Sequence, residues 1–183
     1  GPLDNNAYLI RSDQSGNAVL VDAAAGFDSL SALVEGSSLS AIITTHGHWD
    51  HHQAAREMAE AFAVPALLDP ADSAIADGWF GSDIKIGRFL IGDVEAHILH
   101  TPGHTPGSVS ILLDGVVLTG DTLFPGGPGA TRFDHSSFAR IIESISTQLF
   151  TLGDETVVLP GHGDATTIGT ERGHLQSWVD RGW

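Results

Sequence analysis

The chain has 183 residues, of which 42% are hydrophobic and 17% charged, a composition typical of globular proteins and not of disordered ones. It contains no cysteine, which excludes disulfides and thiolate metal sites and leaves His, Asp and Glu as ligands for any transition metal. With 23 acidic and 8 basic residues, the formal net charge is −15, and Lys and Arg form no cluster. We therefore expect a cytoplasmic protein that acts on a small molecule and not on nucleic acid or a membrane.

The first third of the chain alternates short apolar segments with polar turns. Residues 7–10 and 18–24 flank the polar sequence RSDQSGN and predict a hairpin. Residues 29–36 have a helical pattern that ends in glycine, a typical helix C-terminal cap. Residues 39–45, LSAIITT, predict a buried strand that leads directly into a histidine-rich segment.

The middle of the chain continues this alternation. Residues 52–63 are rich in Ala and Glu and predict a helix, and residues 64–69 predict a strand. The pattern weakens over residues 70–93, where we expect a short helix or a loop. Residues 94–100 predict a further strand, and residues 108–121 predict a hairpin that turns at Asp-Gly, the strongest hairpin signal in the chain.

The last third predicts helices around one more strand. Residues 134–150 carry apolar side chains at helical spacing, and residues 169–183 end the chain as a predicted helix. Residues 155–163 predict a buried strand that runs into a glycine turn. Because strands and helices alternate irregularly and hairpins are included, we expect a layered α/β fold with mixed sheets.

Four of the predicted strands end in glycine-containing turns that carry His or Asp. Such turns let side chains from distant segments converge on a rigid scaffold. The seven candidate metal ligands in these turns are His46, His48, Asp50, His51, His104, Asp121 and His162. A single histidine at a strand end is usually an ordinary polar residue, but four matching turns favour a metal site. Seven ligands suit two metals about 3.5–4 Å apart with one bridging carboxylate.

These turns resemble a known family. HGHWDHH at residues 46–52 resembles the H-x-H-x-D-H signature of the metallo-β-lactamase superfamily. TPGHTPGS, LTGDTLF and LPGHG follow in the order of that superfamily's later motifs, and they are most similar to the glyoxalase II (hydroxyacylglutathione hydrolase) branch. The resemblance covers nearly the whole chain. It implies an αββα sandwich, with two mixed β-sheets flanked by helices and the metals at one edge.

The resemblance also implies how the ligands are shared. His46, His48 and His104 would bind the first metal. A second set of three residues would bind the other metal, and one carboxylate would bridge the two. The second set is Asp50, His51 and His162, and the bridge is Asp121. Two divalent ions are expected, zinc first, with iron or manganese as alternatives. Asp50 is also the expected catalytic residue, as an acceptor of a proton from the attacking water.

The expected reaction is hydrolysis of a small thioester by a metal-activated hydroxide. A thiolate of intrinsic pKa about 8.5 leaves without a strong general acid, which suits a chain with few candidate acids outside the metal site. The alternatives are a persulfide dioxygenase with one iron, and hydrolysis of a lactone or another ester on the same fold. We expect residues 1–183 to form one domain that lacks the helical glutathione-binding domain of glyoxalase II. The substrate contacts are not predicted.

Several residues near the motifs are left outside the expected ligand set. His52 is expected to face solvent or to support the site. His100 is expected either to orient a ligand or to be a buried structural residue, and His135 is expected to be an ordinary histidine. Trp49 is expected to pack under the site or to border the pocket. Trp79, Phe80 and Phe124 are candidates for the wall of a substrate cleft, with core packing as the commoner alternative for such aromatic residues.

Overall fold

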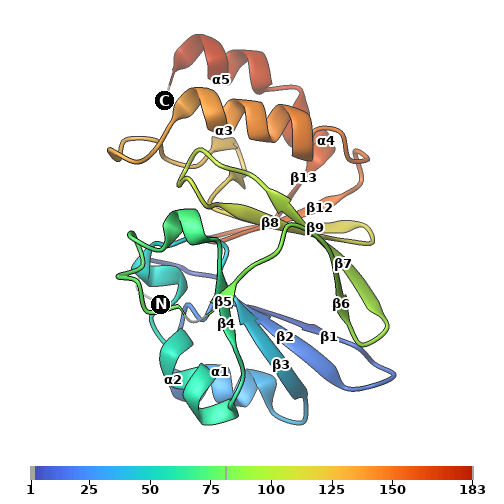
Figure 1. The fold of residues 1–183 in the computed structure, drawn as a ribbon. Coiled ribbons are helices and arrows are strands. Elements are labelled where there is room, and N and C mark those ends of the chain that lie inside the picture. The colour runs from blue at the N-terminus through green and yellow to red at the C-terminus, as the bar shows by residue number, and fades with distance from the viewer. Residues whose placement is uncertain (1–2, 81, 183) are drawn as a thin grey trace.

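Two β-sheets pack face to face, and helices cover both outer sides (Figure 1). This architecture is described by a computed structural model for residues 3–80 and 82–182. Helices α1 and α2 cover the sheet formed by the N-terminal strands, and α3, α4 and α5 cover the other sheet (Figure 1). The predicted αββα sandwich is confirmed.

The first sheet contains five strands in the order β1-β2-β3-β4-β5. They are β1 (Tyr8–Arg11), β2 (Asn17–Val21), β3 (Ser38–Ile43), β4 (Ala66–Leu68) and β5 (Ser82–Asp83). β1 and β2 form the predicted antiparallel hairpin, and the other neighbours are parallel. Parallel neighbours need crossover connections, which α1 (Phe27–Val34) and α2 (Ala55–Phe62) provide after β2 and β3. α2 begins three residues later than predicted, because residues 52–54 form a turn.

The second sheet contains six strands in the order β13-β12-β9-β8-β7-β6. They are β6 (Gly87–Ile91), β7 (Val94–His100), β8 (Val109–Leu113), β9 (Val116–Gly120), β12 (Val157–Pro160) and β13 (Thr166–Thr167). β8 and β9 form the predicted hairpin, and β12 lies parallel to β9. β6 was not predicted; it is an edge strand that pairs only with β7 among the described strands. A short ladder of β10 (Leu123–Phe124) and β11 (Gly127–Pro128) follows β9.

The helices over the second sheet differ from the predicted ones at their ends. α3 (Phe138–Ser144) begins later than residue 134, because the Ser137 side chain caps it, and it continues as the π-helical η3 (Ile145–Leu149). The predicted helix 169–183 is two helices, α4 (Ile168–Arg172) and α5 (Leu175–Arg181), and residue 183 lies outside the described part. None of the helices in the described ranges is long and apolar enough to cross a membrane.

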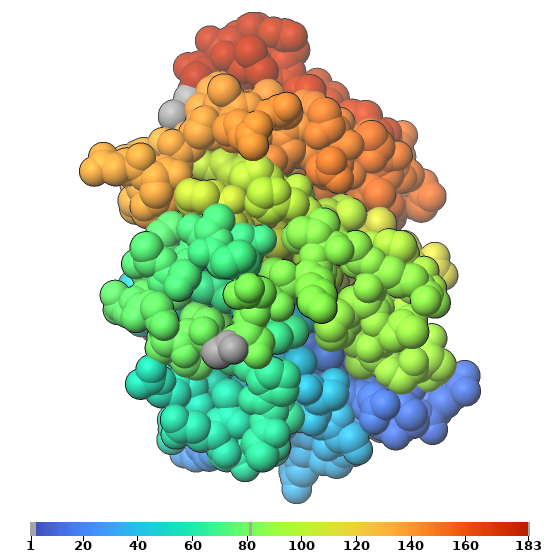
Figure 2. Space-filling view, viewed as in Figure 1, coloured from blue at the N-terminus to red at the C-terminus, as the bar shows by residue number. Residues whose placement is uncertain are grey.

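Alternation along the strands separates the cores. In β2, Val19 and Val21 point between the two sheets, where they pack with Ile43 and Ile98, whereas Leu20 points to the helices of the first sheet. A third cluster joins the second sheet to α3, η3, α4 and α5. The space-filling view shows the same order of layers, with the N-terminal segments below and the C-terminal helices above (Figure 2). Both sheets are therefore held from two sides, which fixes the strand ends.

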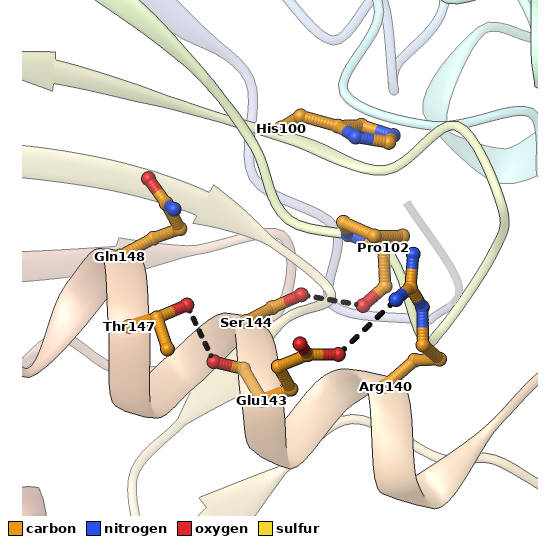
Figure 3. Close-up of a pocket in the computed structure, with 7 residues that line it drawn as sticks. All are labelled: His100, Pro102, Arg140, Glu143, Ser144, Thr147 and Gln148. Carbon is orange, nitrogen blue, oxygen red and sulfur yellow. Dashed lines mark hydrogen bonds and ion pairs between the residues drawn. The ribbon is translucent and has the colours of Figure 1, made fainter.

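The loop between β7 and β8 is anchored to α3. The Ser144 hydroxyl donates a hydrogen bond to the Pro102 carbonyl over 2.7 Å, next to an ion pair between Arg140 and Glu143 (Figure 3). The backbone N–H of Ser137 donates to the Gly103 carbonyl, also over 2.7 Å. α3 therefore holds the segment that carries the predicted ligand His104.

Replacement of Gly103 by alanine is expected to destabilise the fold. Gly103 has φ +144°, and a Cβ there would lie 2.3 Å from the backbone nitrogen of Ile141 in α3. Backbone strain and overpacking each cost about 1–3 kcal/mol, so we expect a loss of at least about 2 kcal/mol in the free energy of unfolding. Chemical denaturation would measure it. Gly173→Ala is the control, since nothing lies within 4 Å of its Cβ position, and an equal, small effect of both changes would contradict the packing.

Candidate metal centre

All seven predicted ligands lie together at one edge of the sandwich. His46 and His48 follow β3, and Asp50 and His51 lie in the adjoining 3-10 turn η1 (Trp49–His51). The other three follow β7, β9 and β12, in the order His104, Asp121 and His162. Their donor atoms form three overlapping groups in which the atoms lie within 4.8 Å of one another: His46, His48 and His104; His46, His51 and Asp121; and Asp50, His51 and His162.

Three imidazoles form the first group. Nδ1 of His48 lies 3.1 Å from Nε2 of His46 and 2.9 Å from Nε2 of His104. Burial and the neighbouring imidazoles lower the pKa of His104 to about 3, while burial and His135 lower the pKa of His48 to about 4. Burial and the other imidazoles also hold the pKa of His46 well below its usual value. These rings are therefore neutral at pH 7, which is the form that binds a metal.

The second group combines two imidazoles with a carboxylate. Nε2 of His162 lies 3.1 Å from Nε2 of His51 and 3.3 Å from Oδ2 of Asp50. Burial alone would raise the pKa of Asp50, but His162, His51 and a hydrogen bond from Asn5 outweigh it and hold the pKa well below the usual value. The Asn5 amide donates to Asp50 Oδ2 over 3.0 Å. Asp50 is therefore a fixed, ionised carboxylate at neutral pH.

Asp121 lies between the two groups. Its Oδ2 is 3.5 Å from Nε2 of His104 on one side and 3.6 Å from Nε2 of His162 on the other, and its Oδ1 is 3.4 Å from Nε2 of His51. Burial raises the pKa of this carboxyl to about 6. Oδ1 is buried and has no hydrogen-bond partner among the described residues. A buried acceptor of this kind is expected where the oxygen coordinates a cation. The donors and this oxygen are consistent with a di-metal site.

Hydrogen bonds fix the outer nitrogens of the predicted ligand imidazoles. His162 Nδ1 donates to the Leu3 carbonyl over 2.8 Å, and His104 Nδ1 donates to the Ala130 carbonyl over 2.7 Å. Such partners set which nitrogen faces a metal. His46 Nδ1 lies 3.2 Å from Thr45 Oγ1. In His104, whose ring is neutral at pH 7, the nitrogen that faces the centre therefore carries the lone pair.

Asp22 fixes His51 and was not predicted. Nδ1 of His51 donates to Asp22 Oδ2 over 2.9 Å, and Thr45 donates to the same carboxylate through its backbone N–H and its hydroxyl. Burial lowers the pKa of His51, but Asp22 and the other two carboxylates raise it to about 9. The signal was present in the sequence, since Asp22 directly follows the apolar run of β2 in the same strand-end position as the ligands.

Asp72 joins two of the ligand loops and was also not predicted. Its buried carboxylate accepts hydrogen bonds from Gly47 N over 2.7 Å, from Gly107 N over 2.6 Å and from Thr105 Oγ1 over 2.6 Å. Gly47 lies between two ligands of the first group, and the other two donors follow His104. Asp72 ends the 3-10 turn η2 (Pro70–Asp72), in the segment where the sequence pattern is weak.

A cavity of about 560 Å³ opens over the donor atoms. Aromatic side chains form much of its wall, including Trp49, which is 59% exposed, as well as Phe124 and Phe133. Arg132 is the one Lys or Arg among the described residues that line it. Trp49 and Phe124 therefore lie where a cleft wall was expected, and Phe133 and Arg132 are added to it. Trp79 and Phe80 do not line this cavity and pack instead against the core between the first sheet and its helices.

Three further histidines can now be placed. His52 is not among the grouped donors; its Nε2 lies 3.2 Å from the Gly47 carbonyl. His100 is exposed, so the expectation of a buried structural residue was wrong, and its Nε2 bonds to the Pro106 carbonyl. His135 was expected to be an ordinary histidine, but its Nε2 lies 3.1 Å from Nε2 of His48. The separation of 87 positions along the chain explains why no local pattern revealed this contact.

Comparisons with known proteins agree with the fold and the motifs. The sequence model of the Metallo-beta-lactamase superfamily matches residues 1–162. The hydroxyacylglutathione hydrolase GloC of Haemophilus influenzae is 32% identical and covers 91% of this chain and 89% of its own length. The probable metallo-hydrolase YqgX of Bacillus subtilis is 31% identical, and the match covers 94% of this chain and 91% of YqgX.

Among solved structures, TTHA1623, in a di-iron-bound form, is 33% identical with a TM-score of 0.84, and the match covers 94% of both chains. The superfamily match over residues 1–162 includes all four turns that carry the donor atoms. The chain belongs to the metallo-β-lactamase superfamily.

Proposed function

We propose that this chain is a two-metal hydrolase that cleaves small thioesters. The observation that carries the proposal is the position of the Asp121 carboxylate between two complete donor sets. His46, His48 and His104 would hold one cation, and Asp50, His51 and His162 the other. Two divalent cations there would supply a nucleophilic water at neutral pH and would polarise a carbonyl oxygen.

The residues of the chain provide the remaining chemistry. Asp50 is ionised, is oriented by Asn5 and lines the cavity, so it can accept a proton from the attacking water. The aromatic wall made by Trp49, Phe124 and Phe133 excludes water from the apolar part of a substrate. A thiolate leaving group, of intrinsic pKa about 8.5, needs no strong general acid. This suits a cavity in which the described lining contains no Lys, Tyr or Cys.

The similarity to GloC supports thioesters as the substrate class. Metal analysis of the purified protein, followed by assays on a thioester panel, would test the proposal. We expect about two divalent ions per chain and release of free thiol from at least one thioester. A single iron with oxygen uptake from a persulfide would instead establish the dioxygenase alternative. Cleavage of lactones or oxygen esters without thioesters would establish the other hydrolase.

Arg132 is expected to bind an anionic group of the substrate. It lines the cavity beside the Phe133 ring, 5.7 Å from the ring centre, and is exposed. For a thioester that carries a carboxylate, Arg132→Ala should raise KM about tenfold with little change in kcat, since a charged hydrogen bond contributes about 1.5–3 kcal/mol. Steady-state kinetics would measure this effect.

Two controls accompany the Arg132 experiment. A neutral thioester should show no such rise in KM, because it presents no group for the guanidinium to bind. Arg56→Ala should behave as the parent protein, because Arg56 lies over Trp79 beside another cavity. Equal effects on neutral and anionic substrates would contradict a direct contact of Arg132 with the anion.

A further inference from the structure

His48 differs from the other four predicted ligand histidines in its orientation. Its Nδ1 faces the centre, where it contacts Nε2 of His46 and Nε2 of His104. The other four present Nε2 to the site and use Nδ1 for an outer contact. The outward atom of His48 is therefore Nε2, and that atom lies 3.1 Å from Nε2 of His135.

We propose that His135 is a positioning residue that accepts the hydrogen bond of His48 Nε2–H. This inference rests on the proposed two-metal site. A proton on Nε2 of His48 leaves the lone pair on its Nδ1, which is the atom that faces the metal position. His135 then carries its own proton on Nδ1 and offers the lone pair of Nε2. One imidazole thus sets the tautomer of the other.

The segment around His135 holds its ring in place. The Phe133 ring lies parallel to the His135 ring, with 7° between the planes and 5.5 Å between the centres. Phe133 also packs against His48, with ring centres 5.0 Å apart. The backbone N–H of Ser136 donates to the Phe133 carbonyl over 2.9 Å, and Ser137 caps α3 directly afterwards. His135 is therefore placed by a closed turn and a helix cap, although its side chain is exposed.

The contact between His48 and His135 should influence only one of the two metals. Backbone carbonyls support His104 and His162, and the buried side chains of Thr45 and Asp22 support the other two. Only His48 among the five depends on an exposed side chain. A change at His135 should therefore affect the first metal and leave the cation bound by Asp50, His51 and His162 unchanged.

The test compares His135→Ala, His135→Gln and the control His97→Ala. In the Gln side chain, Oε1 takes roughly the position of the accepting Nε2. His97 is also exposed and also has one side-chain partner, Glu95, but it lies in β7 away from the site. Each metal-free protein is titrated with zinc and with cobalt against a chelator, and histidine ring N–H signals are recorded by ¹⁵N NMR in the zinc-loaded form.

We expect His135→Ala to weaken one of two metal sites by about 10–100-fold, the usual effect of losing an outer hydrogen bond to a ligand. The His48 Nε2–H signal should be lost or shifted, and His135→Gln should restore most of the affinity. Unchanged affinities in the alanine variant, or a glutamine variant as weak as alanine, would overturn the proposal. If the alanine variant does not fold, the glutamine variant tests the proposal: near-parent metal affinity with a retained His48 Nε2–H signal would support it, and loss of both would overturn it.

These readouts do not depend on catalysis. A parent protein that binds two metals but cleaves no thioester would contradict the proposed function and would leave the role of His135 measurable. Conversely, a thioesterase whose two metal affinities are insensitive to His135 would overturn only this inference.

Discussion

Asp121→Ala is expected to release metal from both positions and to abolish hydrolysis. The carboxylate is the one group that lies between the two donor sets, and no other described carboxylate lies within 4 Å of both His104 and His162. Loss of an outer partner costs about 10–100-fold in metal affinity or activity, so loss of a shared ligand should exceed 100-fold in kcat/KM. Metal content by elemental analysis and turnover of the best thioester would be measured on the same preparation.

Two further variants make the Asp121 experiment decisive. Asp121→Asn keeps the shape but loses the charge, so it should retain less metal than the parent protein and more than the alanine variant. Asp180→Ala is the matched control, because Asp180 is an exposed carboxylate in α5 that contacts Gln176. An alanine variant that is free of metal and fully active would refute the metal mechanism.

Asp72→Ala is expected to have the largest effect on stability. Three buried donors, in Gly47, Thr105 and Gly107, would lose a charged acceptor. Hydrogen bonds to charged groups contribute about 1.5–3 kcal/mol each, so the free energy of unfolding should fall by at least about 3 kcal/mol. The loops that carry His48 and His104 would also lose their common anchor, so metal affinity should fall in any variant that still folds.

Denaturation in the presence and absence of zinc would separate the two effects of the Asp72 change. Asp72→Asn retains one acceptor oxygen and should lose less than the alanine variant. Asp69→Ala is the neighbouring control. The half-buried Asp69 side chain caps η2 through Ala71 N, and its loss should cost about 1 kcal/mol. A stability loss in Asp72→Ala no larger than in Asp69→Ala would show that the carboxylate does not connect the loops.

The pKa shifts in the site give the two metal positions different protonation states in the metal-free protein. Burial lowers the pKa of His48 and His104 far enough that no proton needs to be displaced from the first group at neutral pH. In the second group, carboxylates raise the pKa of His51, so a cation must displace a proton there. The two positions therefore differ in their chemistry before any ligand is bound.

The seven candidate ligands could be selected from sequence because each belongs to a local pattern. An apolar run followed by a glycine turn fixes where a strand ends and which side chain is presented there. The same local rules predicted the hairpin at Asp114-Gly115 and the strand Val94–His100. They misplaced helix starts by three or four residues, because caps such as Ser137 compete with the apolar periodicity.

The residues that support the ligands were decided by the tertiary structure. Asp72 and His135 are polar residues without a distinctive spacing, whereas Asp22 follows a strand as the ligands do. Each of the three acquires its role from a contact across 25 to 87 residues of chain. The carbonyl that holds His162 comes from Leu3, 159 residues away. Sequence thus determined which side chains could bind metal, since ligand chemistry resides in residue type and local turns. Only the packing of two sheets determined which hydrogen bonds orient them, because those partners meet through topology.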